Sequence, residues 1–245
     1  EKVIIGRSEK MSKSKKNVID PEDIINTYGA DTARWFMLSD SPPERDLDWS
    51  ESGITGAWRF SNRLWRLVAA NAATLPPTGT APNSDSATDL RRIIHAAIAG
   101  MTEDLEAFHF NRSVARVHEL VNALSDGDAS KDGAVLREGL ETVTLLIGPM
   151  MPHLAEELWR MLGHEELVAN SSWPVADERL LVQDTVKLAV QVRGKMRGTV
   201  EIPHDADQAT AEQAALALAT VTAALDGDEV KKIIYVPNRI INVIH

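Results

Sequence analysis

The hydrophobic period of the chain changes once, near Trp173-Pro174, and this change limits the possible folds more than any other feature. Before it, from about residue 51 to 165, apolar residues recur at the spacing of helices that bury one face. After it, apolar and other residues alternate, as they do in a β-strand, at Val186, Leu188, Val190 and Val192. We therefore expect a mainly α protein with a small α/β (α+β) domain at its C-terminal end.

The helical part contains several apolar stripes, which together predict a bundle of helices. They lie at residues 58–68, 90–108, 114–124, 135–147 and 154–162. The first stripe is formed by Trp58, Leu64, Trp65 and Val68, and we expect both tryptophans to lie in the core. Ahead of the bundle, Asp20-Pro21 has the sequence of a helix start, with Asp20 as cap and acidic residues in the first turn.

The C-terminal part has the pattern of a ββαββ unit. A hairpin is expected from residues 186–192 and 199–202, with a turn at Gly194-Lys195. An alanine-rich helix over 209–224 and strands over 230–236 and 240–244 complete the unit. We expect four segments along the chain. These are residues 1–50, the helical bundle at 51–165, a linker at 166–184 and the α/β domain at 185–245.

A basic loop near the start of the chain contains the run Lys10-Met11-Ser12-Lys13-Ser14-Lys15-Lys16-Asn17. Residues 1–16 hold six Lys or Arg against two Glu, although the chain carries a formal net charge of −10. Lysine ammonium groups beside small hydroxyl residues suit the binding of phosphate. The alternative is a solvated basic tail. Because the run leads directly into a capped helix, we interpret it as a polyanion-binding loop.

The same residues resemble a known family. Lys10 to Asn17, Ile19-Asp20-Pro21 and Tyr28-Gly29-Ala30-Asp31-Thr32 resemble the second signature of class I aminoacyl-tRNA synthetases. Five further stretches resemble the leucyl enzymes, at residues 47–54, 56–60, 173–177, 191–197 and 234–237. The ordered series identifies the chain as the C-terminal part of a bacterial-type leucyl-tRNA synthetase. The first signature, His-x-Gly-His, is not found, because Met161-Leu162-Gly163-His164 lacks the first His and resembles a helix end.

The resemblance implies a leucine–tRNA ligase that forms leucyl-adenylate from leucine and ATP and passes leucine to tRNA(Leu). It implies that Lys10 and Lys13 are catalytic residues acting on the ATP phosphates. The ATP-binding residues would be Lys10, Met11, Ser12, Lys13 and Ser14. We expect Mg²⁺ to accompany ATP, and no metal site in this chain. We expect no aminoacylation by residues 1–245 alone, since the first signature and the leucine pocket are missing.

The resemblance also implies tRNA-binding segments. The bundle is of the anticodon-binding type, and the C-terminal domain is expected to contact tRNA. Candidate tRNA-binding residues are Lys15, Lys16, Arg59, Arg63, Arg193, Lys195 and Arg197. Such cations contact phosphate and make binding dependent on salt. For Lys15 and Lys16, and for the arginines of the bundle, the alternative is an ordinary solvated surface.

The composition limits the compartment and the partners. The chain has no cysteine, which excludes disulfides and cysteine-type zinc sites and fits a cytoplasmic enzyme. No run of about 18 apolar residues is present, so no membrane partner is expected. We expect a monomer.

Two other interpretations remain open at this stage. The chain could be a stand-alone RNA-binding module that needs no ATP. It could also be the corresponding part of a valyl-type or isoleucyl-type synthetase. The strand pattern of 186–244 argues against the helical tail of the valyl relatives, and the lack of cysteine argues against the zinc site of the isoleucyl relatives. ATP binding only in the presence of the upstream region would favour the synthetase.

Overall fold

The computed structural model describes residues 9–83, 87–126, 132–182 and 185–245. It forms two compact units, Glu1–Leu181 and Val182–His245, which divide the chain within the segment predicted as a linker. The first unit is helical, and the second contains a four-stranded sheet with helices. The predicted fold class is therefore confirmed. Among the helices that the structure describes, none has both the length and the apolar composition needed to cross a membrane.

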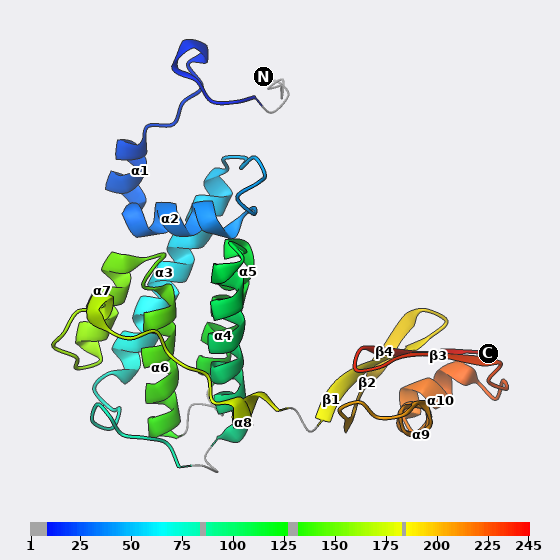
Figure 1. Ribbon diagram of the computed structural model, residues 1–245. Coiled ribbons are helices and arrows are strands. Elements are labelled where there is room, and N and C mark those ends of the chain that lie inside the picture. The colour runs from blue at the N-terminus through cyan, green and yellow to red at the C-terminus, as the bar shows by residue number, and fades with distance from the viewer. Residues whose placement is uncertain (1–8, 84–86, 127–131, 183–184) are drawn as a thin grey trace. The chain divides into compact units, whose positions relative to one another are not determined.

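Unit 1 is a helical bundle with two further helices at one end (Figure 1). The helices α3 to α7 form the bundle, and α2 lies across the end from which α1 and the basic loop extend. The short 3-10 helix η3 and the helix α8 follow the bundle. The elements are η1 (Lys13–Lys15), α1 (Pro21–Tyr28), α2 (Ala30–Ser39), α3 (Glu51–Asn71), α4 (Thr88–Glu106), α5 (Phe110–Leu124), α6 (Gly133–Ile147), α7 (Pro152–Met161), η3 (Val168–Asn170) and α8 (Glu178–Leu181).

Side-chain caps define where several of these helices begin. Asp20 accepts a hydrogen bond from the Glu22 amide at 2.9 Å, and Pro21 occupies the first helical position of α1. Ser50 caps α3 by accepting from the Gly53 amide at 3.1 Å. The helix start predicted at Asp20-Pro21 is thus confirmed.

The core of unit 1 excludes two residues that the sequence pattern had placed in it. Trp58 and Trp65 are 43% and 41% exposed, so the prediction that they are core residues is wrong. The buried side of α3 carries Ala57, Leu64 and Val68 instead. Each tryptophan follows a buried residue by one position, which rotates it by about 100° around a helix with 3.6 residues per turn.

The segment before α8 is attached to α4 by side-chain hydrogen bonds. The indole of Trp173 donates to Thr102 Oγ1 at 2.9 Å. The Asp177 amide donates to Nδ1 of the buried His95 at 2.9 Å. Because Nδ1 accepts, the neutral ring carries its proton on Nε2, which donates to Glu138 at 3.2 Å. Residues of the segment predicted as a linker therefore pack on the bundle.

Glu138 makes the stability of unit 1 depend on pH. Burial raises the pKa of its carboxyl, but the hydrogen bonds from His95 and Arg91 lower it by a larger amount. The net shift of the pKa is therefore downward. A carboxyl whose pKa is lower in the folded state stabilises that state at pH values above its pKa in the unfolded chain, about 4.3. This contribution is lost as the pH falls through the pKa of the folded state. We expect urea unfolding to show a smaller acid-induced loss of stability in Glu138→Gln than in wild type.

The matched control is Glu157→Gln, because Glu157 pairs with Arg160 on the exposed surface of α7. Exposed pairs contribute little to stability, so the control should follow the wild-type pH profile. Identical profiles for wild type, Glu138→Gln and the control would contradict the role of Glu138.

Unit 2 has one sheet with helices on a single face (Figure 1). The strand order is β2-β1-β4-β3, with β1 parallel to β4 and the other pairs antiparallel. Leu188, Val190 and Ile241 of the sheet share a buried cluster with Ala215 and Val221 of the helices. The elements are β1 (Thr185–Val192), β2 (Lys195–Pro203), α9 (Gln208–Leu216), α10 (Ala219–Leu225), β3 (Lys232–Val236) and β4 (Ile240–Ile244).

The alanine-rich segment forms two helices, so the single helix predicted over 209–224 is wrong. Leu218 has an extended backbone between α9 and α10, with φ −69° and ψ 123°. It packs against the core of unit 2, as do Ala215 before it and Val221 after it. The break lets both short helices cover the sheet. The predicted strand at 230–236 begins later, at Lys232.

Candidate functional site

The basic loop closes on itself through Asn17. The Asn17 side chain accepts from the Ser12 amide at 2.8 Å and donates to the Lys10 carbonyl at 3.5 Å. Between these points η1 forms one short turn, and Lys16 ends it in the left-handed conformation with φ 54°. The hydroxyls of Ser12 and Ser14 lie 3.2 Å apart. Reasoning from the sequence assigned Asn17 no role, yet it joins the two ends of the loop.

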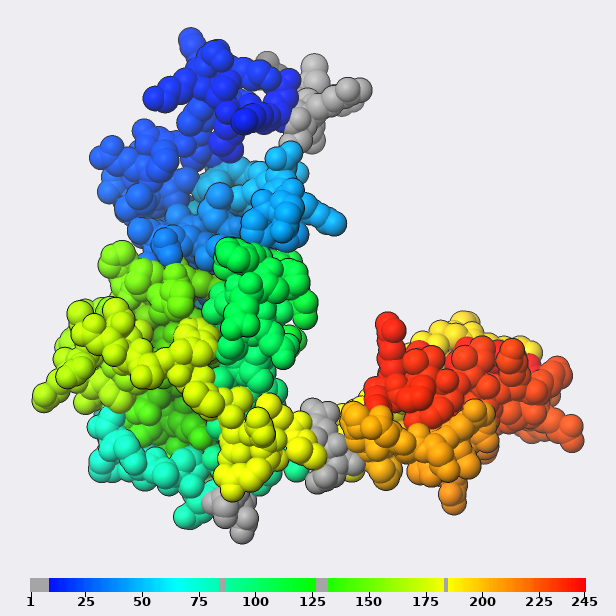
Figure 2. All heavy atoms as spheres, in the orientation of Figure 1, coloured from blue at the N-terminus to red at the C-terminus, as the bar shows by residue number. Residues whose placement is uncertain are grey.

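The lysines of the loop differ in how their ammonium groups are engaged. Lys15 forms an ion pair with Glu9 at 2.7 Å. Lys10, Lys13 and Lys16 are exposed and form no ion pair with any residue of the described part of the chain. In Figure 2 the loop, in dark blue, lies at one end of unit 1 with its surface open to solvent. Three free cations beside two hydroxyls can bind an anion with several oxygens, such as a polyphosphate.

Helix α2, which follows the basic loop and α1 in sequence, is attached to the bundle by side-chain hydrogen bonds. Asp31 accepts from the Leu154 amide at 2.7 Å and pairs with His153 Nδ1 at 2.9 Å, at the start of α7. Arg34 donates to the carbonyls of Met150 and Pro149 at 2.9 and 2.8 Å. These partners are more than one hundred residues apart in sequence. Their spacing along the chain therefore offered no signal from which the contacts could be predicted.

The predicted tRNA-binding arginines of α3 have different environments. Arg63 donates to Asn122 Oδ1 at 2.7 Å and to Ser125 Oγ at 3.1 Å, which ties α3 to the end of α5. Arg59 is exposed and has no hydrogen-bond partner among the described residues. Its guanidinium is therefore free to bind a ligand, whereas that of Arg63 already has a structural role.

The predicted tRNA-binding residues of unit 2 surround the β1–β2 turn. Arg193 and Gly194 have φ of 48° and 75°, which is the geometry of a tight type I′ hairpin turn and explains the glycine. Arg193 donates to the His245 carbonyl at 2.9 Å, and the Gly194 amide donates to Asn242 Oδ1 at 3.0 Å. Lys195 and Arg197 are exposed beyond the turn. The structure thus leaves these two cations available and uses Arg193 to join the hairpin to the end of β4.

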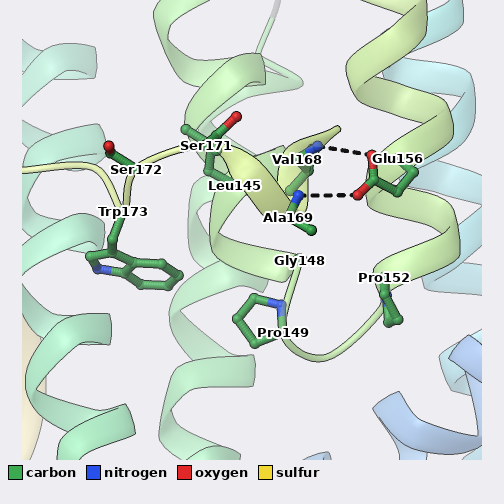
Figure 3. A pocket seen from close by; sticks show the side chains of 10 residues that line it. All are labelled: Leu145, Gly148, Pro149, Pro152, Glu156, Val168, Ala169, Ser171, Ser172 and Trp173. Carbon is green, nitrogen blue, oxygen red and sulfur yellow. Dashed lines mark hydrogen bonds between the residues drawn. The ribbon is translucent and has the colours of Figure 1, made fainter. Parts of the chain in front are cut away.

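A cavity of about 310 Å³ lies between the α6–α7 turn and η3 (Figure 3). Trp173 borders it on one side, and Glu156 borders it on the other. The Glu156 carboxylate accepts from the amides of Val168 and Ala169 at 2.8 and 3.1 Å, so its oxygens are already engaged. The cavity therefore lies beside the contact between η3 and α7, which these hydrogen bonds form. None of the residues predicted for the site lines it.

Comparison with protein families matches two segments of the chain. Residues 88–213, more than half of the chain, match the anticodon-binding domain of tRNA ligase. Residues 3–50, which include the basic loop, match the class I tRNA synthetases for I, L, M and V. The chain therefore belongs to the family of anticodon-binding domains of tRNA ligases.

Individual relatives within that class are leucine–tRNA ligases. The chain is 60% identical to the enzyme of Paramagnetospirillum magneticum over 244 residues and 55% identical to that of Parvibaculum lavamentivorans over 249 residues. These matches cover 98% and 100% of this chain but 28% and 29% of the relatives. The resemblance derived from the motif series is thus confirmed.

A solved structure is also similar. It is the ternary LeuRS–tRNA–LeuAMS complex of Agrobacterium radiobacter K84 agnB2, matched with 31% sequence identity and a TM-score of 0.73. The match covers 96% of this chain and 31% of that chain. The similarity in fold therefore extends over nearly all of the present chain.

Proposed function

We propose that the chain is part of a leucine–tRNA ligase, which joins leucine to tRNA(Leu) through a leucyl-adenylate made from ATP. The observation that carries this proposal is the 60% identity to such a ligase over 98% of the chain. Assigning the chain to an isoleucyl-type or valyl-type synthetase would not account for this identity to a leucine–tRNA ligase. The chain would supply the second ATP signature loop together with tRNA-binding surfaces.

The loop would act on the phosphates of ATP. In adenylation the leucine carboxylate attacks the α-phosphorus, and the bond to pyrophosphate breaks. Negative charge grows on the phosphate oxygens, and fixed cations stabilise it. We propose that Lys13 and Lys10 supply these cations, and that Met11, Ser12 and Ser14 shape the loop. Mg²⁺ would arrive bound to ATP, whose phosphate oxygens it bridges.

The tRNA would contact the remaining basic groups. Lys16, Arg59, Lys195 and Arg197 are exposed, and no ion pair or hydrogen bond of their side chains is found within the described ranges. A phosphate can therefore reach each of them without breaking an existing contact. Lys15, Arg63 and Arg193 would first have to release theirs. We further propose a monomeric enzyme in the cytoplasm, where a chain without cysteine needs no oxidising environment.

The proposal predicts different activities for the isolated chain and for the whole ligase. We expect the purified 245-residue chain to bind tRNA(Leu), with an affinity that falls steeply as salt is raised, and to show no leucylation. We expect the complete ligase to catalyse leucine-dependent ATP–pyrophosphate exchange and leucylation. Filter binding over a salt series and radiolabelled leucine incorporation measure the two properties.

Two results would contradict the proposal. Leucylation by the isolated chain would show that the missing region is not needed. Exchange by the complete protein with another amino acid but not with leucine would remove the leucine assignment. Binding of RNA without any ATP-dependent activity in the complete protein would instead support the stand-alone RNA-binding module.

A further inference from the structure

Helix α2 carries two opposite charges that hold one turn of the bundle. Asp31 and Arg34 are separated by about one helical turn, so their side chains leave the same side of α2. Arg34 donates to the carbonyls of Pro149 and Met150, at 2.8 and 2.9 Å, in the turn between α6 and α7. Asp31 accepts from the Leu154 amide, at 2.7 Å, in the first turn of α7. We call the hydrogen bonds of Asp31 and Arg34 together the α2 clamp.

Each charge of the α2 clamp faces backbone groups of the opposite polarity. The first amides of a helix have no partner within it, and Asp31 satisfies one of them in α7, where Met151 occupies the N-cap position. The Asp31 side chain is 12% exposed and also pairs with Nδ1 of His153 at 2.9 Å. The guanidinium of Arg34 donates to two carbonyls at once. Charged hydrogen bonds of this kind are short and directional, so they hold α2 in one orientation on the turn.

The α2 clamp joins two segments of the chain that have different relatives. Helix α2 lies in the segment that matches the class I synthetases, and the α6–α7 turn lies in the segment that matches anticodon-binding domains. The basic loop precedes α2 in the same segment, with only α1 as a helix between η1 and α2. Gly29 alone separates α1 from α2, with φ 85°. The placement of α2 on the bundle therefore determines where the basic loop begins to extend from it (Figure 1).

A second, apolar attachment holds α2 against α3. Trp35 stacks on Phe60, with ring centroids 4.9 Å apart and ring planes at 3°. Phe36 packs edge-on against Trp49, just before α3, with ring centroids 5.2 Å apart. Trp35 and Phe36 are both buried. Loss of the α2 clamp would therefore leave α2 packed on the core but free to tilt. The stacked rings attach the helix, and the α2 clamp sets its orientation.

We propose that Asp31 and Arg34 are positioning residues for adenylation. They hold α2, and through it the basic loop, so that Lys13 and Lys10 meet the phosphates of ATP. The inference rests on the proposed function and adds two residues that act through the loop. A misplacement of a reacting group by about 1 Å can lower a rate by about 10²-fold. Loss of the α2 clamp should therefore slow the chemical step while every group that contacts ATP is still present.

The test measures leucine-dependent ATP–pyrophosphate exchange by the complete ligase. Asp31→Ala with Arg34→Ala should lower kcat by about tenfold to hundredfold. The KM for leucine should stay near the wild-type value, because the lysines act on phosphate. Asp31→Asn with Arg34→Lys keeps an acceptor for the Leu154 amide and a donor for one carbonyl, and it should recover most of the rate. No recovery with this conservative pair would count against positioning by hydrogen bonds.

Arg116→Ala separates positioning from stability. It breaks the ion pair with the buried Asp104, at 2.6 Å, and is expected to destabilise unit 1 while the α2 clamp stays in place. At a temperature where circular dichroism shows every variant folded, Arg116→Ala should keep a kcat near wild type. Equal losses of kcat in Arg116→Ala and in the alanine pair would show that the α2 clamp contributes stability alone, which would overturn the inference.

A double-mutant cycle tests whether the α2 clamp acts through Lys13. In a Lys13→Ala ligase, the alanine pair should cause a smaller further loss of kcat than it does in wild type, because the group that it positions is gone. Losses that multiply in full would mean that the α2 clamp and Lys13 act independently, and the inference would then be wrong.

The outcomes distinguish this inference from the proposed function. If the wild-type ligase shows no leucine-dependent exchange, the proposed function fails and this inference fails with it. If the wild type is active and the alanine pair matches it, the inference alone is overturned and the proposed function is unaffected.

Discussion

Lys13→Ala in the complete ligase is expected to slow leucine-dependent ATP–pyrophosphate exchange by about 10²- to 10³-fold. The ammonium group of Lys13 is exposed and free of ion pairs within the described structure, so it can meet the phosphates of ATP as charge develops on them. Because this interaction strengthens in the transition state, its loss should lower kcat and leave the KM for leucine near the wild-type value. Exchange kinetics at varied leucine and ATP concentrations measure both quantities.

Lys15→Ala is the matched control, since it removes the same charge two residues away. Lys15 is already paired with Glu9 at 2.7 Å, so we expect at most a modest change in the exchange rate. A rate near wild type for Lys13→Ala would contradict the assignment. Equal losses for both variants would show that the loop contributes only its overall positive charge.

Arg116→Ala is expected to destabilise unit 1 by about 3 kcal/mol, near the low end of the cost of breaking a buried ion pair. Asp104 is 2% exposed and pairs with Arg116 Nε at 2.6 Å. Without Arg116 its carboxylate keeps Arg112 at 3.1 Å and His109 at 4.0 Å. The guanidinium of Arg116 passes directly over Gly100, where the absence of a side chain leaves room for it. Urea unfolding followed by circular dichroism measures the free energy of unfolding.

Two variants distinguish the buried charge from general effects of losing an arginine. Arg160→Ala breaks an exposed pair and should leave the stability nearly unchanged. Adding Asp104→Asn to Arg116→Ala removes the buried charge that has lost its shorter ion pair, and should restore part of the stability. If Arg116→Ala is no more destabilising than Arg160→Ala, the ion pair does not stabilise the junction of α4 and α5.

Much of the fold follows from local sequence signals. Apolar spacing and the cap at Asp20 predicted α1 and the helices of the bundle, because helix starts and buried faces leave marks within one or two turns. They did not predict η3 and α8, which lie in the segment predicted as a linker. The break at Leu218 left no such mark. The sequence there lacks glycine and proline, and packing of α9 and α10 on the sheet decides it. Trp58 and Trp65 were misplaced because large apolar residues are normally buried.

The candidate site could be predicted only in part from the sequence, because some of its contacts form only when the chain has folded. The lysines of the loop form a contiguous motif, so their joint presence could be predicted. The sequence could not predict which lysine pairs with Glu9 and which stay unpaired within the described residues, because this depends on how the loop folds and is closed by Asn17. The role of Arg63 likewise depends on Asn122, which adjoins it only after α3 and α5 have packed together.

The strand order of unit 2 has a consequence for synthesis on the ribosome. β4 is the last of the four strands in sequence, yet it lies inside the sheet and separates β1 from β3. Before it is made, a nascent chain can form the β1–β2 hairpin, but β3 has no neighbouring strand with which to pair. Until β4 is made, the edge of β1 that will pair with β4 is open to pairing with other chains. Deletion of Ile240–Ile244 would therefore divide the sheet rather than trim its border.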